Sequence, residues 1–80
     1  MLTPRQLRAA RALIGWSRQV LAEKSGVPAI TTRQFETGQT DPKLTTVNKW
    51  RRTLEKAGVI FIDPTAEHGP GVMLKDGALR

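Results

Sequence analysis

Arg33 and Gln34 are adjacent in the stretch SGVPAITTRQFETG, residues 25–38, and both carry side chains that can recognise bases. An arginine guanidinium can donate two hydrogen bonds to O6 and N7 of guanine, and a glutamine amide can pair in a similar way with N6 and N7 of adenine. The same side chains could also form an ordinary solvated helix face. The charge of the chain and the elements around this stretch bear on that choice.

The 80-residue chain is strongly basic, with 13 Lys and Arg residues against 7 Asp and Glu, a net charge of +6. Residues 1–58 hold 11 basic and 4 acidic residues, a balance of +7, whereas residues 59–80 hold 2 and 3, a balance of −1. A basic surface of this kind favours a polyanionic partner such as nucleic acid. A merely solvated basic surface would have the same composition.

The composition argues against several other classes of protein. The length indicates one small domain, and without cysteine there is neither a disulfide framework nor a thiolate metal site. The single histidine, His68, cannot form a zinc site alone, so we expect no metal, no cofactor and no enzymatic activity. No apolar run approaches the roughly 18 residues of a spanning helix, so no membrane is expected. The lack of cysteine is compatible with a reducing cytoplasm.

Two short helices are predicted to meet at a tight turn around Gly26. Ser17 can cap a helix over RQVLAEKS, residues 18–25, and the next helix begins near Pro28 and ends at Gly38. Glycine tolerates the left-handed conformation that such a turn requires. A link of about three residues between two short helices indicates a helix-turn-helix, whose second helix lies in the major groove of DNA.

Further elements are predicted on both sides of this pair. Thr3 and Pro4 are suited to begin a first helix that Gly15 ends. A fourth helix over about residues 43–57 carries an apolar stripe at helical spacing: Leu44, Val47, Trp50, Leu54 and Ala57. Beyond it, VIFI (59–62) and VML (72–74) are predicted strands, and the final DGALR is expected to fray. Since an isolated hairpin is marginally stable, it must pack on the helices or pair with another chain.

The segment WSRQVLAEKSGVPAITTRQFETG resembles the helix-turn-helix of the Cro/cI-type, phage-repressor-like regulators, the XRE family. The resemblance covers roughly residues 3–57 and rests on residues at the family's spacing: Ser17, Leu21, Ala22, Gly26, Val27, Thr31, Phe35, Glu36 and Gly38. It implies an all-α, lambda-repressor-like bundle of four helices over residues 1–58. A short β appendage, residues 59–80, resembles an extension of short bacterial members.

The resemblance also implies a function, the sequence-specific binding of double-stranded DNA. We expect a bacterial or phage repressor that acts in the cytoplasm, at the nucleoid, and binds a palindromic operator as a homodimer. The edge of VIFI could pair two subunits, or VIFI could fold back on its own helices. Two alternatives are an antitoxin-like or phage accessory regulator whose tail binds a second protein, and an adaptor that has lost DNA binding. With no ligand-binding domain in the sequence, we expect no control by a small molecule.

Site residues follow from the positions that match the family. The resemblance implies that bases are contacted by Pro28, Ala29, Ile30, Arg33 and Gln34, although Ala29 and Ile30 could simply pack. It implies that phosphates are contacted by Arg18, Thr37, Gln39, Thr40 and Lys43, of which the last four could instead be merely exposed. Arg11 and Glu36 match positions that form an ion pair in similar proteins, and we expect this pair to orient the third helix.

Three positions depart from the family's pattern. Arg18 stands where Gln is usual, and Pro28 stands where Ser or Thr usually caps the third helix, so that cap is expected to be missing. Thr32 replaces a buried Ile or Val, and its hydroxyl is expected to bond to the carbonyl of Pro28. Both tryptophans, Trp16 and Trp50, are expected to pack in or beside the core rather than to stack on bases.

Overall fold

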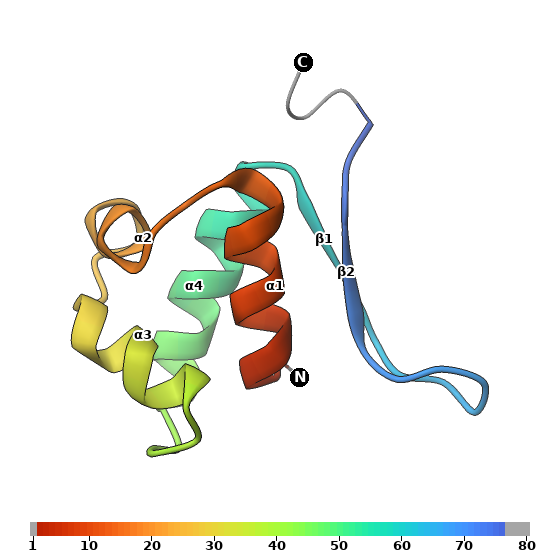
Figure 1. The fold of residues 1–80 in the computed structure, drawn as a ribbon, viewed down its shortest axis with the longest axis horizontal. Helices are drawn as coiled ribbons and strands as arrows, with labels where there is room; N and C mark the ends of the chain where they lie inside the picture. The colour runs from red at the N-terminus through yellow and green to blue at the C-terminus, as the bar shows by residue number, and fades with distance from the viewer. Residues whose placement is uncertain (1, 77–80) are drawn as a thin grey trace.

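The computed structural model describes residues 2–76, as four helices followed by a two-stranded antiparallel sheet (Figure 1). The elements are α1 (Pro4–Ile14), α2 (Arg18–Ser25), α3 (Ala29–Glu36), α4 (Leu44–Lys56), β1 (Val59–Ile62) and β2 (Gly71–Leu74). In Figure 1, α1 and α4 lie in the middle, with α2 and α3 on one side and the hairpin on the other. The predicted helical bundle with a β appendage is confirmed. Most of the DGALR segment, residues 77–80, lies outside the described residues.

The first two helices begin and end at the residues that the sequence predicts. Thr3 Oγ1 accepts from the backbone N–H of Gln6 at 3.1 Å, and Gln6 Oε1 accepts from the N–H of Thr3 at 2.9 Å, which completes a capping box for α1. Ser17 caps α2 through its side-chain oxygen. Gly26 follows α2 with φ of 77°, a left-handed conformation that fits the tight turn to α3.

The start of α3 lacks a side-chain cap, as the sequence predicts. Pro28 occupies the cap position and forms no side-chain hydrogen bond, so only its backbone carbonyl accepts from the N–H of Thr31 at 3.0 Å. The helix has eight residues, and helices this short are marginal in isolation. The position of α3 therefore depends on the side chains that hold its inward face.

The core lies between the four helices and extends under the sheet. Its buried hydrophobic residues are Leu2, Leu7, Ala10, Ile14, Leu21, Val27, Phe35, Trp50, Leu54 and Val59. Phe35 of α3 stacks on Trp50 of α4, with ring centroids 5.1 Å apart. Trp16 packs against the edge of this core and Trp50 is fully buried, so both predicted positions are confirmed.

Two predictions about the core are wrong. Thr32 is fully buried, but its hydroxyl oxygen accepts a hydrogen bond from Trp50 Nε1 at 3.1 Å, and no bond of this hydroxyl to the Pro28 carbonyl forms. The threonine thus satisfies an indole N–H that an Ile or Val could not. Leu44 is 71% exposed rather than part of the apolar stripe, because it is the first residue of α4, ahead of the turns that contact the core.

The hairpin packs on the helices of its own chain. Val59 pairs with Leu74 and Phe61 with Val72, and these four side chains pack in or against the core. Gln6 of α1 is 3% exposed, and its Nε2 donates to the carbonyl of Ile62 at 3.2 Å and to that of Gly71 at 3.0 Å. One side chain of α1 therefore holds both strands at the loop end of the hairpin.

Candidate nucleic-acid interface

The α3 helix has one inward face and one solvent-facing side. Thr32, Phe35 and Glu36 are buried and hold the helix against the rest of the chain. Among the residues predicted to contact bases, Pro28, Ile30 and Arg33 are exposed, and Ala29 and Gln34 are partly exposed. Ile30 is 54% exposed, which leaves its methyl groups available to a partner. The five predicted positions thus all reach the surface of α3 or of the turn before it.

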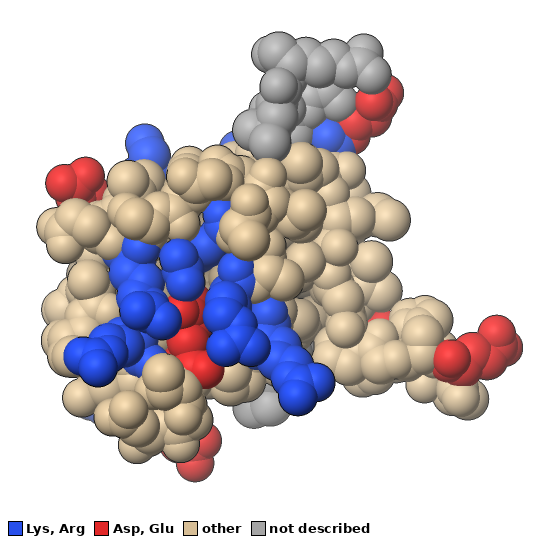
Figure 2. Space-filling view, in the orientation of Figure 1, with Lys and Arg blue, Asp and Glu red and all other residues tan. Residues whose placement is uncertain are grey.

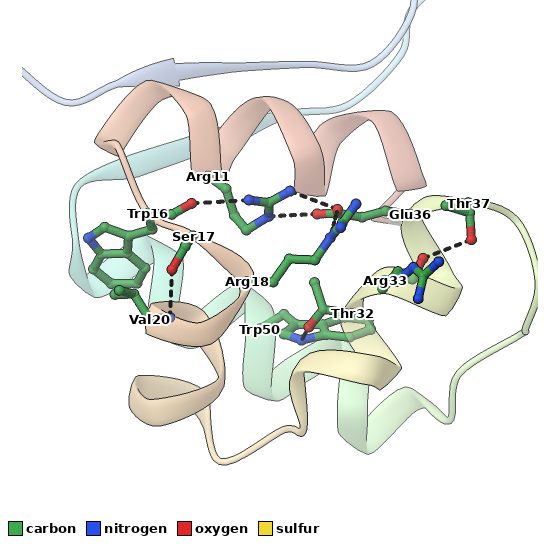
Figure 3. Close-up of polar contacts among 10 residues, drawn as sticks. All are labelled: Arg11, Trp16, Ser17, Arg18, Val20, Thr32, Arg33, Glu36, Thr37 and Trp50. Atoms are coloured by element: carbon green, nitrogen blue, oxygen red, sulfur yellow. Dashed lines mark hydrogen bonds and ion pairs between the residues drawn. The ribbon is translucent and has the colours of Figure 1, made fainter.

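A carboxylate anchors the end of α3 to α1 and α2. The structure brings Arg11 and Glu36 together: Nε and Nη2 of Arg11 each donate to one carboxylate oxygen, both at 2.7 Å. Arg11 Nη1 also donates to the backbone carbonyl of Trp16 at 3.1 Å. Figure 3 shows this fork between Arg11 and Glu36 in the space between α1 and α3. Because the geometry is bidentate, it fixes the direction as well as the distance of Glu36.

Arg18 takes part in the same cluster. Its Nε donates to Glu36 Oε1 at 2.9 Å, and its side chain remains 38% exposed, whereas the Glu36 side chain has no exposed surface. Its two terminal nitrogens form no hydrogen bond within residues 2–76. Arg18, the first residue of α2, is thus held by its inner nitrogen and stays partly exposed; Figure 3 shows its guanidinium beside Glu36. The sequence did not predict the contact with Glu36.

The loop after α3 exposes the remaining residues predicted to contact phosphates. Thr37, Gln39, Thr40 and Lys43 are all exposed. The Thr37 hydroxyl donates to the carbonyl of Arg33 at 2.8 Å. Since a phosphate oxygen only accepts, Thr37 would have to release this carbonyl to donate to DNA. Lys43 precedes α4, and like Gln39 and Thr40 it forms no side-chain hydrogen bond or ion pair among the described residues, so its ammonium is available as a donor.

Two arginines of α1 extend the basic surface and were not singled out from the sequence. Arg5 and Arg8 are exposed and, with Thr37 and Gly38 after α3, line a hollow of about 630 Å³. Figure 2 shows Lys and Arg side chains gathered over α1, α2 and α3, with acidic side chains in their midst. The sequence could have predicted this extension, because Arg5 and Arg8 are three residues apart and lie on the face of α1 opposite its buried residues.

Comparisons with known proteins agree with this geometry. The model of a helix-turn-helix family matches residues 7–58, which include α2, α3, α4 and most of α1. Among curated proteins, none matches the chain. Within residues 2–76, no group of three or more His, Cys, Asp or Glu side chains could hold a metal ion. In the same part of the chain, no helix has the length and apolar character needed to cross a membrane.

Proposed function

The chain belongs to the XRE-type, Cro/cI-like family of helix-turn-helix DNA-binding transcription regulators, and we propose that it is a repressor that recognises a specific operator with α3 in the major groove. One observation carries this proposal. The inward side of α3 is fixed by Phe35 and by the Glu36 cluster, while Ile30 and Arg33 remain exposed on a basic face. Because one side of α3 is packed against the protein and the other is exposed, the helix can enter the major groove of DNA.

Arg33 and Gln34 supply base recognition in this proposal. The guanidinium of Arg33 is exposed and forms no ion pair among the described residues, so it is available for O6 and N7 of a guanine. In this proposal Gln34 pairs with an adenine and Ala29 and Ile30 contact thymine methyl groups. Pro28, in the turn before α3, also contacts bases. Arg18 and Lys43, at the start of α2 and before α4, then fix the helix relative to the two DNA strands through phosphates.

Operator specificity favours a homodimer. One α3 contacts only a few base pairs, so a useful site requires two half-sites about one helical turn apart, related by the twofold symmetry of the dimer. The hairpin offers a surface for this contact, because Ile60 and Met73 are cross-strand partners and are 41% and 49% exposed. We propose that the dimer acts in the bacterial cytoplasm, where the DNA is. A second protein bound at the same apolar pair is the alternative, as in an antitoxin-like or phage accessory regulator.

Selection of bound sites from random double-stranded DNA tests the proposal. We expect an enriched palindrome whose half-sites report the bases read by Arg33 and Gln34. The Arg33→Ala variant should relax the preference at one base pair of each half-site, a change of roughly 1–3 kcal/mol in discrimination. The matched phosphate variant is Lys43→Ala, which should weaken binding to all sequences alike and reduce the salt slope by about one. Arg18→Ala is a poorer control, because that variant also disturbs Glu36.

Three outcomes would contradict parts of the proposal. No enriched sequence at any salt concentration would indicate an adaptor without DNA binding. Equal behaviour of the Arg33→Ala and Lys43→Ala variants would show that the roles assigned to these residues are wrong. A non-palindromic site bound by a monomer would exclude the dimer while leaving the recognition by α3 intact.

A further inference from the structure

A second basic hollow, of about 610 Å³, lies between the C-terminal end of α2 and the C-terminal half of α4. The space exists because small side chains, Ser25, Thr53 and Ala57, line the region where the two helices approach. Trp16, from the link between α1 and α2, adds an aromatic side chain to the lining. The volume is within the range of about 300–1,000 Å³ that is usual for small-molecule sites.

Four cations and no carboxylate line this hollow: Lys24, Lys49, Arg52 and Lys56. The three from α4 are spaced three and four residues apart and therefore share one face of the helix, where like charges destabilise it. Helix dipoles account for Lys24 and Lys56, which lie in the last turns of α2 and α4, but not for Lys49 and Arg52. A bound anionic ligand would reduce the repulsion among these four cations.

The partners of these cations are also informative. None of the four forms an ion pair within residues 2–76, and the Nζ of Lys24 lies 5.4 Å from the centroid of the Trp16 ring. In contrast, the neighbouring Arg51 pairs with Glu55 at 3.4 Å and lies over the ring of Phe61. The charges of α4 are thus neutralised where the helix faces the hairpin and left open where it faces the hollow.

Most of the hollow lies away from the residues proposed to contact DNA. Lys24 lies at the opposite end of α2 from Arg18. Along α4, at 1.5 Å per residue, Lys49 is about 9 Å from Lys43, and Lys56 is about 20 Å from it. DNA recognition by α3 therefore gives no role to this second group of cations.

We propose that the hollow binds a nucleotide, a small ligand with both phosphate groups and a planar ring. The guanidinium of Arg52 can form a bidentate pair with a phosphate, and the lysine ammonium groups can donate to the remaining phosphate oxygens. The Trp16 indole offers a surface for the ring in the position that the Lys24 ammonium occupies in this structure. A site of this kind would make the regulator responsive to a small molecule, which the sequence, with no ligand-binding domain, gave no reason to expect.

Calorimetric titration of the 80-residue protein tests this site with three probes: ATP, adenosine and inorganic tripolyphosphate. We expect saturable 1:1 binding of ATP with a dissociation constant of roughly 10 µM to 1 mM, because the hollow is open to solvent. Adenosine and tripolyphosphate should each bind at least about tenfold more weakly, since adenosine lacks the phosphate groups and tripolyphosphate lacks the ring. The Lys49→Gln and Arg52→Gln variants should each lose about tenfold in ATP affinity.

Matched variants separate a site from a general charge effect. Arg51→Gln removes the same charge from the same helix but outside the hollow, and it should change ATP affinity by less than about twofold. Trp16→Leu should remove most of the advantage of ATP over tripolyphosphate. Circular dichroism of each variant, compared with the unmodified chain, shows whether it is folded.

Four results would overturn the proposal. The first is the absence of saturable heat up to about 5 mM ATP. The second is an equal loss of affinity in the Arg51→Gln and Arg52→Gln variants. Tripolyphosphate that binds as tightly as ATP would show that charge alone is recognised. Finally, if ATP does not bind but Lys49→Gln weakens binding to a non-operator duplex as much as Lys43→Ala does, the cations serve the DNA backbone instead.

Discussion

Replacing Glu36 by glutamine is expected to destabilise the protein by about 3 kcal/mol, at the lower end of the range for removing one partner of a buried ion pair. The carboxylate has no exposed surface and accepts three charge-assisted hydrogen bonds, two from Arg11 at 2.7 Å and one from Arg18 at 2.9 Å. The amide of glutamine keeps one acceptor oxygen but turns an NH₂ donor toward guanidinium donors. It also leaves two positive charges close together without their counter-charge.

The exposure of the two arginines places the expected value at the lower end of that range. The Arg11 side chain is only 14% exposed and cannot be fully hydrated in place, whereas that of Arg18 is 38% exposed and can recover part of the loss from water. A loss of 3 kcal/mol corresponds to a decrease in Tm of about 12–24 °C for a domain of this size. The total stability expected for 80 residues is only about 4–12 kcal/mol, so the variant should remain folded but with little margin.

Urea unfolding followed by circular dichroism measures this change in the free energy of unfolding. The matched control is Glu55→Gln, which neutralises a 46%-exposed carboxylate in the i,i+4 pair with Arg51 and should cost less than about 0.5 kcal/mol. If Glu36→Gln costs no more than this control, the cluster does not hold α3, and the reasoning about its orientation fails. If stability falls as expected but DNA affinity is unchanged under folding conditions, the cluster is structural only.

Three further changes test other contacts by the same urea measurement. Thr32→Val should cost about 1–3 kcal/mol because the Trp50 indole N–H loses its acceptor in the core, and a neutral result would contradict the hydrogen bond. Gln6→Met should cost about 1–3 kcal/mol by leaving two strand carbonyls without their donor and the Thr3 N–H without its acceptor, and amide exchange should accelerate in the hairpin before it does in α4. Gly26→Ala should cost about 1–2 kcal/mol because its φ is 77°, whereas Gly69→Ala, also with open space for a methyl group, should be nearly neutral.

Local features of the sequence predicted the helices and their limits well. Thr3 and Ser17 cap helices, and Gly26 turns the chain, because these effects depend on residues within one helical turn. The missing cap at Pro28 was predicted for the same reason. The strand assignments also held, since VIFI is β-branched and aromatic and is followed by a loop rich in turn residues.

Contacts between side chains that are distant in the sequence were harder to predict. Arg18 was assigned to phosphates alone, although Glu36, 18 residues away, accepts a bond from its inner nitrogen. Gln6 was not singled out, because a glutamine in the first turn of a helix is normally solvated, and only the docked hairpin gives its amide two acceptors. Leu44 fitted the helical period but lies ahead of the core. Periodicity gives the direction of a side chain, but the length of the contact surface decides whether that direction is buried.

The contacts of Gln6 also have a consequence for the order of folding. They join residues separated by 56 and 65 positions, whereas the contacts of α2 with α3 are local. Closing so long a loop costs chain entropy, and contacts of high sequence separation form late in folding. We therefore expect the helices to assemble first and the hairpin to dock afterwards. On a ribosome that synthesises residues 1–58 first, α3 would be in place before the β appendage closes over α1.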